Sequence, residues 1–120
     1  MFPKFLPTGV EQLTEPASIA LAQTVEQKPL TTPLSKQPIN TTYVHQGKDG
    51  TPFLLLHGFD SSVLEYRRLL PLLAAQNETW TVDLLGFGFT DRLLEVKYLP
   101  YDFRTHLYSF WKALINKPVI

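Results

Sequence analysis

The pattern of hydrophobic and polar positions changes close to residue 39 of this 120-residue chain. Six of the ten prolines precede that point. Proline removes a backbone donor and disfavours helix at the residue before it, so the spacing predicts a largely extended arm over residues 1–38. One or two helical turns are compatible with the residues between Thr14 and Gln27. A surface arm packed on the domain is the simplest interpretation, and a partner-binding arm and a disordered segment are the alternatives.

Beyond residue 38, short apolar runs alternate with amphipathic segments. The elements expected from this pattern are, in order, strands over 39–44 and Phe53–Leu56, a helix over Ser62–Gln76, a strand over Trp80–Leu85, a helix from Asp102, and a strand onset at Pro118. Strands that alternate with helices indicate right-handed crossovers. We therefore expect an α/β fold over residues 39–120, with a mostly parallel sheet and flanking helices.

Each expected helix has a cap and an apolar face. Ser62 and Glu65 match a capping box, and Pro71, which lies inside the helical pattern, is expected to kink or break the helix. Asp102 is the expected cap of the later helix. The apolar faces are Leu69, Leu72 and Leu73 in the first helix, and Phe103, Leu107, Trp111, Leu114 and Ile115 in the second.

Composition and charge exclude several classes of protein. Eleven Lys and Arg balance eleven Asp and Glu, which argues against nucleic-acid binding, and the absence of cysteine excludes disulfides and cysteine zinc sites. The apolar runs are too short for a membrane span or a signal peptide, so a cytoplasmic protein is expected. His45, His57 and His106 are scattered without a metal-ligand spacing, and we expect neither a metal nor a cofactor.

The first candidate for chemistry is H-G-F-D, which directly follows the Phe53–Leu56 run. Ligands of open α/β sheets gather beyond the carboxyl ends of the strands. Gly58 permits a backbone turn that a Cβ would hinder, and such a turn can aim the Phe59 N–H into a cleft, where it would stabilise negative charge on a substrate oxygen. The alternative is an ordinary strand-to-helix turn with a buried, hydrogen-bonded His57.

The second candidate is the segment D-L-L-G-F-G-F-T-D, which begins at Asp83. Its glycines, Gly86 and Gly88, suggest a nucleotide-binding loop. A dinucleotide fingerprint needs a third small residue where this chain has Asp91, and that carboxylate would repel a pyrophosphate. A glycine-hinged loop that the side chains of Asp83 and Thr90 close is the better interpretation.

Together, in this order and strand context, the two motifs resemble the N-terminal part of the α/β-hydrolase superfamily over residues 39–120. Residues 53–92 also look like the α/β-fold hydrolases of cyanobacteria and plastids. The resemblance implies a serine-type hydrolase of ester-like or related small substrates, with a G-x-S-x-G nucleophile, an acid and a histidine in that order. Phe59 carries over through its backbone N–H in the oxyanion hole, and His57 and Gly58 carry over as the turn that shapes it. Asp83, Gly86 and Gly88 are expected to form a structural loop.

No serine of the chain lies in a G-x-S-x-G pattern, and the elbow would follow the strand that starts at Pro118. We therefore expect a hydrolase fragment that is inactive by itself, with a small-molecule substrate only in an intact protein. A non-catalytic fragment or interaction module of the same fold is the alternative. A self-contained site of His57 with Ser61 or Ser62 is disfavoured, because a helix cap explains these serines. The interrupted strand would leave an apolar edge, so self-association is expected.

Overall fold

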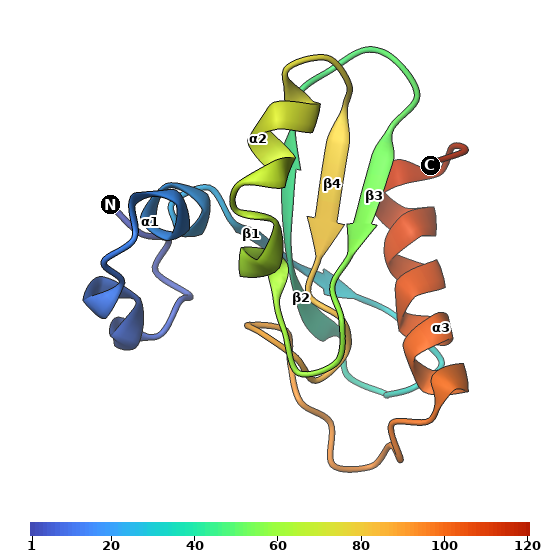
Figure 1. Ribbon diagram of the computed structural model, residues 1–120. Helices are drawn as coiled ribbons and strands as arrows, with labels where there is room; N and C mark the ends of the chain where they lie inside the picture. The colour runs from blue at the N-terminus through green and yellow to red at the C-terminus, as the bar shows by residue number, and fades with distance from the viewer.

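The computed structural model describes residues 1–120 and contains one four-stranded mixed sheet with helices on both faces (Figure 1). The strands are β1 (Glu26–Leu30), β2 (Ile39–Gln46), β3 (Phe53–Leu56) and β4 (Thr79–Val82), and their order in the sheet is β1-β2-β4-β3. The pairs β1–β2 and β2–β4 are antiparallel, whereas β3 and β4 are parallel. The predicted α/β class is confirmed, and the parallel part of the sheet lies at its β3 side.

The last residues of the chain pair with the outer edge of β3. Ile120 donates its N–H to the carbonyl of Pro52 at 2.9 Å, and Leu54 donates to the carbonyl of Ile120 at 3.0 Å. This is the hydrogen-bond pattern of parallel strands. The prediction of a strand onset at Pro118 is therefore confirmed, and β3 lies between this segment and β4.

The helical elements form two layers around the sheet. They are the 3₁₀ helix η1 (Thr8–Gln12), α1 (Pro16–Ala22), the 3₁₀ helix η2 (Val63–Tyr66), α2 (Leu69–Ala74), α3 (Pro100–Phe110) and the π-helical turn η3 (Trp111–Ile115). Successive side chains of a strand point to opposite faces. Val44 accordingly packs with α1, η2 and α2, while its neighbour Tyr43 packs with α3 and η3 on the other face. None of the helices is long and apolar enough to cross a membrane.

Residues 1–38 contribute to both the sheet and the core. Strand β1 pairs with β2 from Glu26–Tyr43 to Leu30–Ile39, and it tolerates Pro29 because it is the edge strand. Buried residues of η1, α1 and their surroundings share one hydrophobic cluster with Val44, Val63 and Leu70: they are Leu6, Val10, Leu21, Ala22 and Val25. The helical turns expected between Thr14 and Gln27 are present as α1, and a domain boundary at residue 38 stays a prediction.

The single helix predicted over Ser62–Gln76 is divided into η2 and α2. The break expected near Pro71 is present: α2 begins two residues before it, so Pro71 is the third residue of α2, where its missing N–H costs nothing. The Ser62 hydroxyl accepts the N–H of Leu64 at 3.1 Å, and not that of Glu65. The predicted apolar face is also wrong: Leu70 is fully buried, whereas Leu72 is 73% exposed.

Two boundaries and one buried residue also differ from the prediction. Strand β4 ends at Val82 rather than at Leu85, because the chain turns at Asp83. Helix α3 begins at Pro100, and the Asp102 carboxylate reaches back to the N–H of Leu99 at 2.9 Å. The residues of α3 and η3 that are buried are His106, Phe110 and Ile115. Of the predicted stripe, Ile115 belongs to this buried set, and Leu107, Trp111 and Leu114 are partly buried and pack against the same cluster. The burial of the polar residue His106 was not predicted.

Candidate active site

The two motifs lie at the same edge of the sheet. Because β3 and β4 are parallel, their carboxyl ends meet there, at the end to which both arrows point in Figure 1. The H-G-F-D turn leaves β3 and the loop that begins at Asp83 leaves β4. This is the edge at which open α/β sheets bind their ligands.

His57 joins the two motifs through its ring. The side chain is buried, its Nε2 accepts the N–H of Leu84 at 3.0 Å, and its Nδ1 lies 2.7 Å from the carbonyl oxygen of Gly58. An Nε2 that accepts must be unprotonated, so the proton is on Nδ1 and is donated to Gly58. His57 is therefore a neutral bridge between the loops, and both of its nitrogens are engaged.

The turn after His57 has an unengaged amide at Phe59. Gly58 donates its N–H to Glu65 Oε1 at 3.2 Å, whereas the N–H of Phe59 makes no hydrogen bond within the chain. The Phe59 ring is 88% exposed. The turn itself is made by Asp60, which has a φ of 59° in the left-handed region.

The conformational argument for Gly58 is wrong. A Cβ placed on Gly58 meets no atom within 4 Å, and its φ is not among the positive values of the chain. Asp60 takes the left-handed conformation instead, since a short polar side chain tolerates it.

Asp83 organises the loop after β4 from a fully buried position. Its Oδ1 accepts the N–H of Val63 at 2.7 Å and its Oδ2 accepts the N–H of Phe89 at 2.8 Å. Burial raises the pKa of Asp83 to about 6, and the two amide donors act in the opposite direction. Thr90 donates its hydroxyl to the Asp83 carbonyl at 3.0 Å and accepts the N–H of Thr42 at 3.0 Å. The loop is thereby fastened to both η2 and β2.

The two glycines of this loop are required by its geometry. Gly86 and Gly88 have φ values of 79° and 56°. A Cβ on Gly88 would lie 2.3 Å from Oδ1 of Asp83, and one on Gly86 would lie 2.5 Å from the Tyr98 ring. Tyr98 closes the far side of the loop, because its hydroxyl donates to the Leu93 carbonyl at 2.8 Å and accepts the Leu93 N–H at 2.7 Å. No motif in the sequence pointed to Tyr98.

An apolar pocket of about 360 Å³ opens beside the H-G-F-D turn. The Phe87 ring belongs to its lining, with its centroid 5.2 Å from that of the Phe59 ring and 6.0 Å from that of the Phe103 ring. The pocket is lined by Phe59, Gly86, Phe87, Arg92, Leu93, Leu94, Tyr98 and Phe103. Arg92 is the one charged residue of the lining, so the space suits an apolar group.

The remaining candidates for nucleophile, base or metal ligand lie apart. His45 contacts Glu78 at 3.0 Å, at the end of β4 opposite to the site, and His106 is buried on α3, 2.9 Å from the Thr41 hydroxyl. Neither Ser61 nor Ser62 makes a hydrogen bond with His57, whose nitrogens are engaged elsewhere. No three His, Asp or Glu side chains gather as a possible metal site.

Comparison with known sequences relates the chain to hydrolases. No model of a known protein family matches it. An α/β hydrolase domain-containing protein of Arabidopsis thaliana, VTE7, is 41% identical over 99% of this chain and 38% of its own length. An uncharacterized hydrolase of Saccharomyces cerevisiae, YNR064C, is 46% identical over 44% of this chain and 19% of its own length. The chain thus spans well under half of the curated relatives that it matches.

Comparison with solved structures identifies the fold. A thermophilic esterase from Thermogutta terrifontis superposes with a TM-score of 0.70 at 21% identity, over 78% of this chain and 34% of that one. The meta-cleavage product hydrolase CumD of Pseudomonas fluorescens superposes with a TM-score of 0.61 at 28% identity, over 72% of this chain and 31% of that one. Sheet order, crossovers and the two turns define the N-terminal part of an α/β-hydrolase fold. The chain belongs to the α/β-hydrolase superfamily.

Proposed function

We propose that this chain forms the N-terminal part of a serine-type hydrolase for esters or related small substrates, and that Phe59 supplies one donor of its oxyanion hole. The observation that carries the proposal is the unengaged N–H of Phe59 at the carboxyl end of β3. The amide follows two residues that are held by hydrogen bonds, the His57 ring and the Gly58 N–H, and the turn borders the apolar pocket.

The chemistry of ester hydrolysis uses such a donor directly. A serine oxygen forms a bond to the acyl carbon while a histidine takes the serine proton, and the electron pair of the C=O bond moves onto the carbonyl oxygen. An N–H that is held in position stabilises this negative charge without further reorganisation. His57 is not that base, because its Nε2 accepts from Leu84 and its Nδ1 donates to Gly58.

The pocket supports an apolar substrate group. Phenylalanine and leucine side chains dominate its lining, and the exposed Phe59 ring lies at its edge. Contact with such a lining removes apolar substrate surface from water, which favours binding. We therefore propose esters with an apolar acyl or alcohol group rather than multiply charged substrates.

The nucleophile is proposed to lie outside these 120 residues. No serine here has the G-x-S-x-G context, and the Ser62 hydroxyl accepts from Leu64 at the start of η2. The chain by itself is then expected to be inactive and to remain unlabelled by a fluorophosphonate probe. Stoichiometric labelling at Ser61 or Ser62 would contradict this part of the proposal.

A hybrid protein tests the oxyanion role. Residues 1–120 replace the aligned part of the Arabidopsis relative, and the hybrid is assayed by fluorophosphonate labelling and with p-nitrophenyl esters of apolar acids. Phe59→Pro removes the N–H, and Phe59→Ala keeps the N–H but removes the ring. We expect Phe59→Pro to lower kcat by about 10²–10³-fold, as for the loss of one oxyanion donor, and Phe59→Ala to act mainly on KM.

Two outcomes would overturn the proposal. One is a folded hybrid that is neither labelled nor active, which would favour a non-catalytic interaction module. The other is a Phe59→Pro hybrid that retains the kcat of the unsubstituted hybrid. Circular dichroism and thermal unfolding of each variant separate these outcomes from misfolding.

A further inference from the structure

We infer that Glu65 is a positioning residue, which holds the turn so that the Phe59 N–H faces the substrate oxygen. The inference rests on the proposed function and names a residue that the resemblance does not supply. Glu65 and its neighbour Tyr66 both belong to η2 and both bind the turn. We call these two side chains the η2 clamp.

The two side chains of the η2 clamp form hydrogen bonds with the backbone on both sides of His57. Tyr66 donates its hydroxyl to the carbonyl of Leu56, the last residue of β3. Glu65 Oε1 accepts the N–H of Gly58 at 3.2 Å. The His57 ring is fixed to Leu84, so Leu56, His57 and Gly58 each have one anchored group, whereas the N–H of Phe59, the next residue, makes no hydrogen bond within the chain.

Glu65 contributes to the turn and not to the core. Its side chain is exposed, so the hydrophobic clusters do not depend on it. The hydroxyl of Ser61 and the N–H of Gly58 lower the pKa of Glu65, so the carboxylate is ionised at neutral pH. A charged acceptor makes a stronger hydrogen bond than a neutral one. An exposed glutamate whose hydrogen-bond partner is the N–H of Gly58 has a role in orienting that turn.

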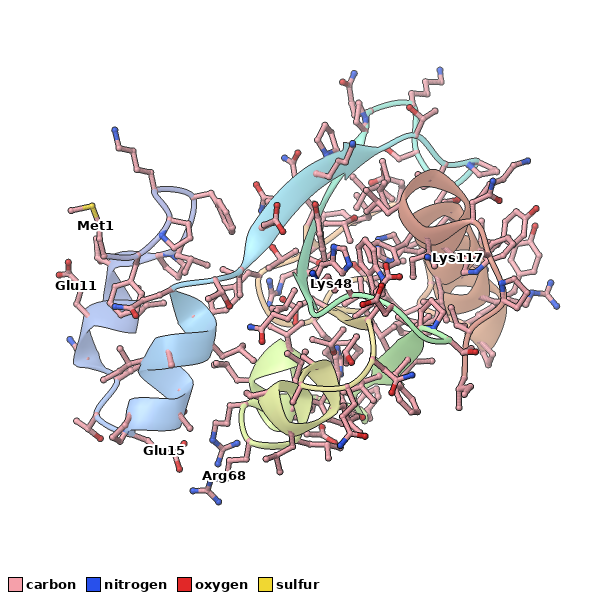
Figure 2. All side chains as sticks on the ribbon, turned by 90° about the horizontal axis from the view of Figure 1, so that it is seen from above. Met1, Glu11, Glu15, Lys48, Arg68 and Lys117 are labelled. Carbon is pink, nitrogen blue, oxygen red and sulfur yellow. The ribbon has the colours of Figure 1, made fainter.

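Helix η2, which carries the η2 clamp, is itself held in place by hydrogen bonds and ion pairs. The N–H of Val63 is bound to buried Asp83, and Arg67 Nη1 donates to the carbonyl of Leu64 at 3.1 Å. Arg67 and Arg68 also bind the carboxylate of Glu15, which reaches across from the N-terminal segment toward them (Figure 2). The helix that carries Glu65 is thus held from two directions, as a positioning element requires.

The test uses Glu65→Ala and Glu65→Gln in the hybrid protein described above. Alanine removes the acceptor, whereas glutamine keeps an oxygen in the same place. We expect Glu65→Ala to lower kcat by about tenfold with little change in KM, because a displaced donor weakens only transition-state binding. Glu65→Gln should restore most of the loss. Glu11→Ala, at a glutamate on the outer side of the N-terminal segment (Figure 2), is the matched control and should change neither constant.

A second measurement on the 120-residue chain makes the test independent of activity. Amide hydrogen exchange followed by NMR should show faster exchange at Gly58 in Glu65→Ala than in Glu65→Gln, at an unchanged unfolding temperature. Unchanged kcat in Glu65→Ala, alongside a large Phe59→Pro effect, would refute the role of Glu65 and leave the proposed function standing. Equal losses in both Glu65 variants with lowered unfolding temperatures would also refute it, since that is the signature of a structural role.

Discussion

Asp83 and His106 are fully buried titratable residues whose pKa values are moved in opposite directions by the same cause. Burial disfavours the charged form of each. It raises the pKa of Asp83 from 3.8 to about 6 and lowers the pKa of His106 from 6.5 to about 4. At neutral pH, His106 is therefore neutral, with one ring nitrogen bonded to Thr41 and Nδ1 without a partner.

These two shifts have opposite effects on stability as the pH falls. For His106 the stability present above about pH 6.5 is lost toward pH 4, because the unfolded state takes up a proton that the folded state does not. For Asp83 the contribution is fully present below about pH 3.8 and is lost as the pH rises through about 6, because here the folded state binds the proton more tightly. Each pKa shift changes the free energy of unfolding by about 3 kcal/mol across its pH range. Because the two changes have opposite signs, they largely cancel.

Replacing His106 should leave the effect of Asp83 on the pH dependence of stability without the opposing effect of His106. On going from pH 7 to pH 4.5, we expect His106→Gln to gain about 2–3 kcal/mol in the free energy of unfolding relative to the unsubstituted chain, whatever its stability at pH 7. Urea denaturation at both pH values measures this, and the other titrating groups cancel in the comparison. An identical pH dependence in the two proteins would show that His106 is not held neutral by burial.

At the scale of elements, the loop after β4 depends on the close approach of Gly88 to Asp83. We expect Gly88→Ala to lower the free energy of unfolding by about 3 kcal/mol, because the new Cβ displaces a carboxylate that satisfies two buried amides. Gly58→Ala is the matched control, since its Cβ meets nothing, and should change stability by under about 1 kcal/mol. Chemical denaturation measures both, and equal effects would contradict the loop geometry.

The elements that could be predicted are those whose signal is local. The apolar run of β3 follows from the hydrophobic pattern, and its position between β4 and the Pro118 segment is what the resemblance to α/β hydrolases implies. Strand β1 could not be predicted, because its polar residues and Pro29 suit only an edge strand and β2 must exist first. The predicted apolar face of α3 does pack on the sheet, but the burial of His106 could not be predicted, because it depends on a contact with Thr41, 65 residues away in the chain.

The candidate site also contains residues that could be predicted from a local sequence signal and residues that could not. The H-G-F-D turn and the glycine loop are contiguous in sequence, so their residues could be named in advance. Glu65 was interpreted as part of a capping box, and only the fold shows that it reaches Gly58 instead. Tyr98 closes its loop through one hydroxyl bonded to Leu93, an interaction with no sequence signature.

For the whole molecule, the N-terminal segment is part of the core rather than an appendage. We expect Leu21→Ala to lower the free energy of unfolding by about 2–4 kcal/mol, because the side chain is 3% exposed and packs with Val44 and Leu70. Gln23→Ala, at the exposed end of α1, should be nearly neutral. A small effect of Leu21→Ala on urea denaturation would instead describe an arm that folds independently of the sheet.

The β3 edge bears on the association of the chain with itself. Ile120 pairs only with the first half of β3, and Leu56 beyond it is 42% exposed. Uncovered apolar edges tend to pair with other chains. We expect the chain to self-associate, and Leu56→Lys to shift it toward monomer in sedimentation velocity. Leu94→Lys, at a fully exposed loop residue, is the control, and equal effects of both would point to net charge rather than to the edge.

The sheet order also governs what happens while the chain is being made. Strand β3 pairs with β4, yet 22 residues separate Leu56 from Thr79. Strand β2 also pairs with β4, and 32 residues separate Gln46 from Thr79. At roughly 5–20 residues per second, a ribosome exposes β3 for about 1–4 seconds before its partner exists. Four consecutive apolar residues are then available to chaperones, so the yield of folded protein in a cell should depend on the speed of translation between β3 and β4.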